Sequence, residues 1–131
     1  MSPHTAAPVS TELADTADNL TGFGRHVQQI VDGLMGIATG TWTADETSTL
    51  LAVLGGGVGE DDIDSLKALV IQRLGDPATN PGLRELTPRR AREIRALTRQ
   101  YAAYDRDFAP RDLLSEAAGA ADIDCPHPTD H

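Results

Sequence analysis

The arginines are the residues of this chain whose type and spacing bear most directly on function. Eight of the eleven basic residues lie between Arg84 and Arg111, in a protein whose formal net charge is −9. At 100° per residue of a helix, five of them share one side: Arg89, Arg92, Arg95, Arg99 and Arg106. Arginine matches carboxylate and phosphate groups with two parallel hydrogen bonds, which a lysine cannot do. The pattern therefore predicts a surface for an acidic partner.

Three interpretations of these arginines stay open at the level of sequence. They are an ordinary solvated helix face, a docking surface for an acidic protein, or a contact with nucleic-acid phosphates. The sequence favours a protein over a nucleic acid, because a helix-turn-helix needs a turn of roughly 3–4 residues. The loop between the expected helices 44–54 and 61–74 is longer and rich in glycine.

Other residue groups indicate neither catalysis nor a cofactor or metal site. No nucleophile and base can be paired, so we do not expect an enzyme. The glycine run 55–59 lacks the GK[ST] ending of a phosphate-binding loop and is interpreted as a flexible connector. The acids at 60–64 lack the spacing of a calcium loop and suit the start of a helix. Cys125, His127 and His131 lie in a tail that offers no supporting contacts, so they predict adventitious metal binding at most.

Composition limits the class of protein. A chain of 131 residues predicts one domain. The single cysteine fits a reducing compartment, so we expect a cytoplasmic protein. No apolar run approaches the roughly 20 residues that a membrane span requires. The pI of about 4.7 argues against general adhesion to DNA or to anionic membranes.

Apolar periodicity and capping residues predict an all-α fold. We expect a small helical bundle of four main helices, at 11–39, 44–54, 61–74 and 88–108, with a short C-terminal helix ending near residue 118. Thr43 with Glu46, and Thr87 with Pro88, are typical starts of helices. The predicted organisation is a disordered arm at 1–10, a helical domain at 11–118 and a disordered acidic tail at 119–131.

The first helix carries an apolar stripe that predicts self-association. From Phe23 the apolar residues recur at 4-3-4-3 spacing, as in a coiled coil. The stripe keeps its phase across Gly22 and Gly24, which favours one long, kinked helix over two. Such a helix exceeds its neighbours in length and leaves apolar surface for a second copy. The predicted oligomer interface consists of Leu20, Phe23, Val27, Ile30, Leu34 and Ile37.

Two further expectations concern burial. The helix 61–74 is apolar around more than half its circumference, so we expect it to be the most buried helix. Tyr101 and Tyr104 lie on the apolar face of 88–108 and are expected to point into the core. The sequence as a whole predicts a non-enzymatic protein-interaction module, such as an adaptor, an assembly component or a small regulator. The alternative is a nucleic-acid-binding transcriptional or phage/plasmid-type regulator that uses the same arginines.

Overall fold

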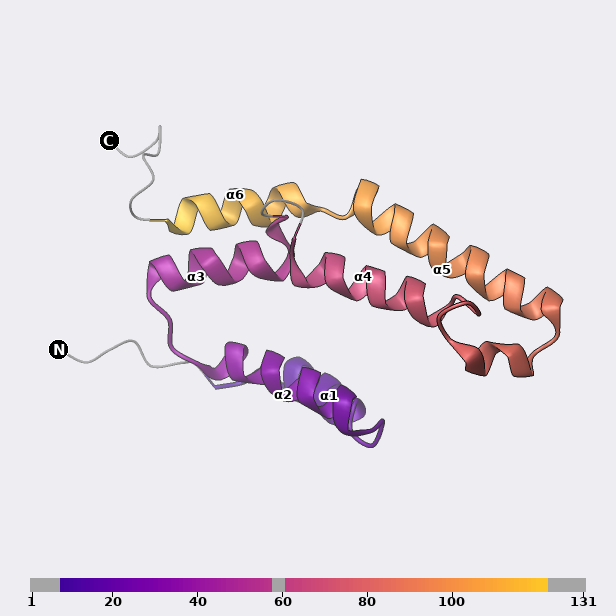
Figure 1. Cartoon of the computed structure of the whole chain (residues 1–131). Helices are drawn as coiled ribbons and strands as arrows, with labels where there is room; N and C mark the ends of the chain where they lie inside the picture. The colour runs from indigo at the N-terminus through magenta and orange to yellow at the C-terminus, as the bar shows by residue number, and fades with distance from the viewer. Residues whose placement is uncertain (1–7, 58–60, 123–131) are drawn as a thin grey trace. The chain divides into compact units, whose positions relative to one another are not determined.

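The structure, a computed structural model, describes residues 8–57 and 61–122 (Figure 1). These residues form six α-helices, a π-helical turn and a 3₁₀ turn, with no strand among them. The all-α prediction is therefore confirmed, with six helices in place of four main helices and a short one. The chain divides into two compact units, a first unit at Met1–Thr43 and a second unit at Ala44–His131. Most of the predicted N-terminal arm and C-terminal tail lies outside the described residues.

The first unit contains two helices, α1 (Thr11–Asn19) and α2 (Arg25–Thr39). The prediction of one helix over 11–39 is wrong, because the backbone leaves the helical conformation at two glycines between them. Gly22 has φ +87° and Gly24 has φ +104°, a region that residues with a side chain rarely adopt. The apolar phase survives this break, which is why the periodicity alone suggested a continuous helix.

The second unit runs outward along one line of helices and returns along another (Figure 1). The outward segments are α3 (Ala44–Leu51), the π-turn η1 (Ala52–Gly56) and α4 (Ile63–Leu74). After the 3₁₀ turn η3 (Pro81–Glu85), α5 (Pro88–Phe108) and α6 (Arg111–Ala121) return. As a result α4 packs on α5, while α3 and η1 pack on α6.

Local capping chemistry explains the helix starts that could be predicted. The hydroxyl of Thr87 accepts a hydrogen bond from the Arg90 N–H at 3.3 Å, and Pro88 needs no partner at the first helical position. The helix starts predicted at residues 44 and 88 are confirmed, because α3 begins at Ala44 and α5 at Pro88, whereas the helix predicted to begin at residue 61 begins at Ile63. The predicted tail boundary shifts, because α6 continues past Gly119 to Ala121.

The glycines after α3 are part of the packed structure. The helix predicted to reach residue 54 ends at Leu51 and widens into η1, where Gly55 and Gly56 are buried. A Cβ added to Gly55 would lie 2.7 Å from Leu114 Cδ1 of α6. Gly57 follows with φ +70°. For residues 55–57 the interpretation as a flexible connector is wrong, since the missing side chains let η1 approach α6 closely.

The core of the second unit is built from small residues: its buried apolar side chains are those of Ala68, Ala91, Ala102 and Ala118. In the described part of the first unit, the buried apolar residue is Val31. The prediction that helix 61–74 is the most buried one is wrong: within α4, Ala68 is the one buried residue, and Leu66 and Leu69 are more than 60% exposed. Alanines at the seam between α4 and α5 allow a short distance between the helix axes, and this leaves the larger apolar side chains outside the seam.

Gly75, directly after α4, lies close against Thr98 of α5. A Cβ at this position would lie 2.6 Å from the Cβ of Thr98. We expect Gly75→Ala to lower the free energy of unfolding by about 1–3 kcal/mol, the usual cost of overpacking. Gly119→Ala is the matched control, because it lies in α6 with no described atom within 4 Å of the added methyl group. Urea unfolding should show this control unchanged or stabilised by about 0.5–1 kcal/mol, and equal losses in the two variants would contradict the assigned packing.

Candidate functional site

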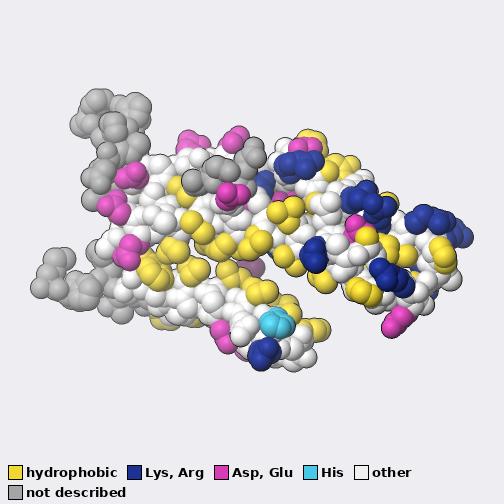
Figure 2. Space-filling view, in the orientation of Figure 1, with side chains coloured by type: hydrophobic (Ala, Val, Ile, Leu, Met, Phe, Trp, Pro, Cys, Tyr) yellow, Lys and Arg dark blue, Asp and Glu magenta, His cyan; other side chains and the backbone are white. Residues whose placement is uncertain are grey.

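The five predicted arginines lie together on α5, and we call this surface the arginine side. Arg89, Arg92, Arg95, Arg99 and Arg106 are all exposed. On the face that Figure 2 displays, the Lys and Arg side chains of the second unit gather over α4 and α5, whereas acidic side chains gather over α3 and α6. The charge segregation seen in the sequence is therefore also a segregation in space within this unit.

The arginine side is only partly neutralised by its neighbours. Arg95 Nε lies 3.8 Å from Asp76 Oδ1, and Arg106 Nε lies 3.5 Å from Asp107 Oδ1. Within residues 8–57 and 61–122, no ion pair involves Arg89, Arg92 or Arg99. The ion pairs of Arg95 and Arg106 are exposed, and such pairs contribute little to folding. The other three side chains are exposed and have no acidic partner among the described residues.

The six residues of the predicted oligomer interface are placed less regularly than the sequence suggested. Leu20 caps α1 and Phe23 lies in the link to α2, so only four of the six share one helix. These four are Val27, Ile30, Leu34 and Ile37. Phe23 and Ile30 are 68% and 62% exposed, and Leu34 is also exposed.

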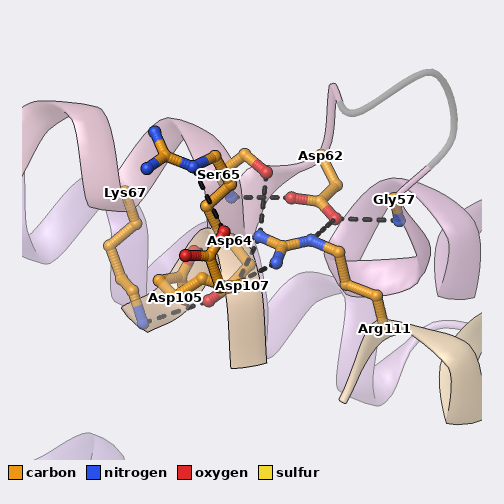
Figure 3. Close-up of polar contacts among 9 residues, drawn as sticks. Gly57, Asp62, Asp64, Ser65, Lys67, Asp105, Asp107 and Arg111 are labelled. Atoms are coloured by element: carbon orange, nitrogen blue, oxygen red, sulfur yellow. Dashed lines mark hydrogen bonds and ion pairs between the residues drawn. The ribbon is translucent and has the colours of Figure 1, made fainter. Parts of the chain in front are cut away.

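A second polar site, which the sequence analysis missed, centres on Arg111 at the start of α6 (Figure 3). Its Nε donates to Asp62 Oδ2 at 3.1 Å, and its Nη2 lies 2.9 Å from Asp105 Oδ2 and 3.1 Å from Asp64 Oδ2. Nη2 also donates to the Ser65 hydroxyl at 2.9 Å, and Nη1 donates to the Asp105 carbonyl oxygen. We call Asp62, Asp64, Ser65, Asp105 and Arg111 the Arg111 cluster.

The cluster joins three helix ends. Asp62 is the N-cap of α4: its Oδ1 accepts from the Ser65 N–H at 2.6 Å, and its Oδ2 accepts from the Gly57 N–H at 2.8 Å. Asp105 lies in the last turn of α5, and Arg111 opens α6. The interpretation of the acids at 60–64 as helix-start residues is confirmed for Asp62. Its second role could not be predicted, because its partner Arg111 is 49 residues away along the chain.

The pKa values in the cluster respond to burial and to its opposed charges. Burial raises the pKa of Asp62, but hydrogen bonds from Ser65 and Arg111 outweigh it, and the pKa is lowered overall. The pKa of Asp64 is raised, first by its contact with Asp105 and then by burial. The pKa of Arg111 is raised chiefly by its bond to Asp105, so the guanidinium stays charged. The pKa of Lys67, next to Asp64, is raised chiefly by Tyr101.

The lowered pKa of Asp62 predicts a loss of stability in acid. Its contribution is fully present above the unfolded pKa of about 3.9 and is lost as the pH falls through the lower folded pKa. Asp64 acts in the opposite direction, because its raised pKa favours the folded state as it becomes protonated. We expect the free energy of unfolding of the wild type to fall more steeply below about pH 4 than that of Asp62→Asn. Urea unfolding between pH 3 and pH 6 checks this, and equal slopes would argue against an ionised, bonded Asp62.

A cleft opens beside the Arg111 cluster, and we call it the aromatic cleft. Its volume is about 460 Å³, and Asp64, Asp105 and Arg111 contribute to its lining. The apolar part of the lining consists of Leu54, Gly55, Tyr101, Tyr104, Phe108, Ala109, Pro110 and Leu114. The expectation that Tyr101 and Tyr104 point into the core is wrong, because they are 39% and 54% exposed and lie at this cleft. The buried residues of α4 and α5 are alanines, and the two rings lie outside this packing.

Comparison with known proteins identifies no relative of this chain. The sequence matches no family model, and neither a curated protein nor a solved structure matches it. No helix in the described segments is long and apolar enough to cross a membrane. Among the same residues, no group of three or more His, Cys, Asp or Glu side chains is arranged to hold a metal ion. Cys125, His127 and His131 of the predicted adventitious metal site lie outside the described residues.

Proposed function

We propose that this protein is a non-enzymatic protein-interaction module that docks an acidic protein surface on the arginine side of α5. The observation that carries the proposal is the exposure of Arg89, Arg92 and Arg99, for which the described chain supplies no ion pair. An adaptor, an assembly component and a small regulator are the roles that such a surface fits. The surrounding chain is acidic, so an acidic partner is attracted locally rather than by the protein as a whole.

The distribution of arginines along α5 supports a rigid docking surface. Arg92 and Arg99 are seven residues apart, which places their Cα atoms about 10 Å apart along the helix at 1.5 Å per residue. Arg92 lies in the second turn and Arg99 near the middle of a 21-residue helix that packs on α4. A rigid helix holds its charges in one register, which favours a partner whose carboxylates have a matching spacing.

A nucleic-acid partner is the second candidate, and one observation favours it. All five residues of this surface are Arg, and guanidinium groups bind phosphate as well as carboxylate. Against it, the connection between α3 and α4, residues 52–62, is longer than the turn of roughly 3–4 residues in a helix-turn-helix. Rings that would stack bases are also missing here, because Tyr101 and Tyr104 lie at the aromatic cleft with the Arg111 cluster instead.

Affinity capture from native host lysate, with and without nuclease, tests the proposal. Three baits are compared: the wild type, R92E/R99E and the charge-matched control R25E/R73E, whose arginines are also exposed. We expect a protein that survives nuclease, binds the wild type and the control, and is lost with R92E/R99E. If the captured material disappears after nuclease treatment, the arginine side binds nucleic acid instead of a protein. Equal capture by all three baits would show that the arginine side does not bind the partner, which would contradict the proposal.

Self-association through the first unit is a separate proposal. Phe23, Ile30 and Leu34 present exposed apolar side chains on or next to α2, and a second copy offers the same surface in a symmetric dimer. We expect a dimeric mass in light scattering at tens of micromolar, and a monomeric mass for I30E/L34E. L97E, at an exposed apolar position of α5, is the control that should remain dimeric. A monomeric wild type would contradict the proposal.

A further inference from the structure

We propose that the aromatic cleft binds a small organic cation, namely an ammonium group carried on an apolar body such as an arylalkyl chain. This inference is independent of the docking surface, because the cleft is lined by different residues from the arginine side. It rests on the rings that line the cleft, on the charges around it and on its size.

Aromatic rings are concentrated at the cleft. The whole chain has five aromatic residues, and three of them, Tyr101, Tyr104 and Phe108, line this one cleft. The ring centroids of Tyr104 and Phe108 are 5.6 Å apart, with the planes inclined at 42°. Phe108 is 73% exposed. Accessible aromatic faces attract cations through the ring quadrupole, and clusters of such rings are a known means of binding ammonium groups.

The charges around the cleft select the sign of the ligand. Asp64, Asp105 and Arg111 line it, Asp62 lies behind them, and Lys67 contacts Asp64 at 3.4 Å. Three carboxylates thus face two cations, a net charge of about −1. The nearby Arg106 and Asp107 pair with each other and leave this balance unchanged. A monocation would neutralise the group.

The hydrogen-bonding capacity of the Arg111 cluster also favours a cationic ligand. Each of the three nitrogens of the Arg111 guanidinium already donates within the cluster. Of its five N–H groups, one on Nη1 is left for an anionic ligand, which would have to displace an internal bond to gain a second. The carboxylates of Asp64 and Asp105, by contrast, have room for about four hydrogen bonds each, and their contacts with Arg111 and Lys67 do not fill them. The cleft therefore accepts a donor that carries positive charge.

The size of the cleft favours a small molecule over a peptide. A volume of about 460 Å³ lies within the range of roughly 300–1,000 Å³ that is common for small-molecule sites. The side chain of Asp105 is only 10% exposed and that of Asp64 25%. A compact ammonium group reaches these oxygens while its apolar body stays against the rings of Tyr104 and Phe108.

The test is an NMR titration of the full-length ¹⁵N-labelled protein with 2-phenylethylammonium, and separately with neutral 2-phenylethanol and anionic 3-phenylpropanoate. We expect the amine to shift the backbone amides of residues 101–111 and of Asp64. The alcohol should bind about tenfold more weakly, and the carboxylate not at all, since cation–π contacts contribute factors of this order. Equal binding of the amine and the alcohol, or shifts elsewhere in the chain, would overturn the proposal.

Variants distinguish binding in the aromatic cleft from non-specific hydrophobic binding elsewhere on the protein. Tyr104→Leu and Phe108→Leu keep apolar bulk but remove a ring, and each should weaken amine binding about five- to tenfold. Both side chains are exposed, so the fold should persist, which the amide spectrum checks. Phe23→Leu, in the first unit, is the matched control and should bind like the wild type. Tighter binding of a lysine-containing peptide than of the free amine would overturn the assignment to a small molecule.

Discussion

Replacement of Arg111 by methionine should lower the free energy of unfolding by about 3 kcal/mol, one of the two largest effects that we expect. The side chain of Asp62 is fully buried, that of Asp105 is 10% exposed, and Arg111 is the cation bonded to both. Removal of one partner from a buried ion pair typically costs about 3–5 kcal/mol, because the remaining charge is left without compensation. We expect the lower end of this range, since the Arg111 side chain is 17% exposed and water can partly replace it.

Urea unfolding measures this effect against two related variants. Arg99→Met removes an exposed arginine that forms no ion pair within the described residues, and it should change stability by less than about 0.5 kcal/mol. Arg111→Lys keeps the charge but cannot bridge Asp62, Asp64 and Asp105 at once, so its loss should be intermediate. A loss below about 1 kcal/mol for Arg111→Met would show that the cluster does not tie α4, α5 and α6 together.

The second large effect concerns binding rather than folding. R92E/R99E should weaken binding of the acidic partner about a hundredfold, because each substitution removes an attraction and adds a repulsion between like charges. The free energy of unfolding should change by less than about 0.5 kcal/mol, since both side chains are exposed and have no ion pair within the described chain. Titration calorimetry with the captured partner measures the first quantity, and urea unfolding the second.

Controls for this prediction use charge and salt. R25E/R73E carries the same change in net charge and should bind the partner within about twofold of the wild type, because long-range effects of exposed charges are screened. Raising the ionic strength should weaken binding of the wild type more than that of R92E/R99E. Unfolding of R92E/R99E would instead identify these arginines as internal partners of acidic segments.

Features that depend on neighbouring residues were predictable from sequence. Thr87 and Pro88 specify the start of α5 through one hydrogen bond and one missing N–H, both within four residues. The arginine side followed from helical geometry once that start was known. Gly22 and Gly24 show the limit of this reasoning: the apolar phase continues across them, and only the backbone angles separate α1 from α2.

Features that depend on distant contacts were not predictable. Arg111 appeared in the sequence as one more member of a basic segment, and Asp62 as a helix cap. Their pairing arises because η1 brings the start of α4 to the start of α6. The apolar residues of α4 gave no hint of which side faces α5, since they surround more than half the helix. The structure places Ala68 in the seam and leaves Leu66 and Leu69 exposed.

The central claim is that the arginine side of α5 receives an acidic protein. Its most direct test is a side-chain NMR footprint, in which the Nε–Hε signals of the arginines are followed as the captured partner is added to the labelled full-length protein. We predict that the signals of Arg89, Arg92 and Arg99 shift or broaden, while those of Arg25 and Arg73 stay in place. Movement of the latter two signals, with those of α5 unchanged, would contradict the account.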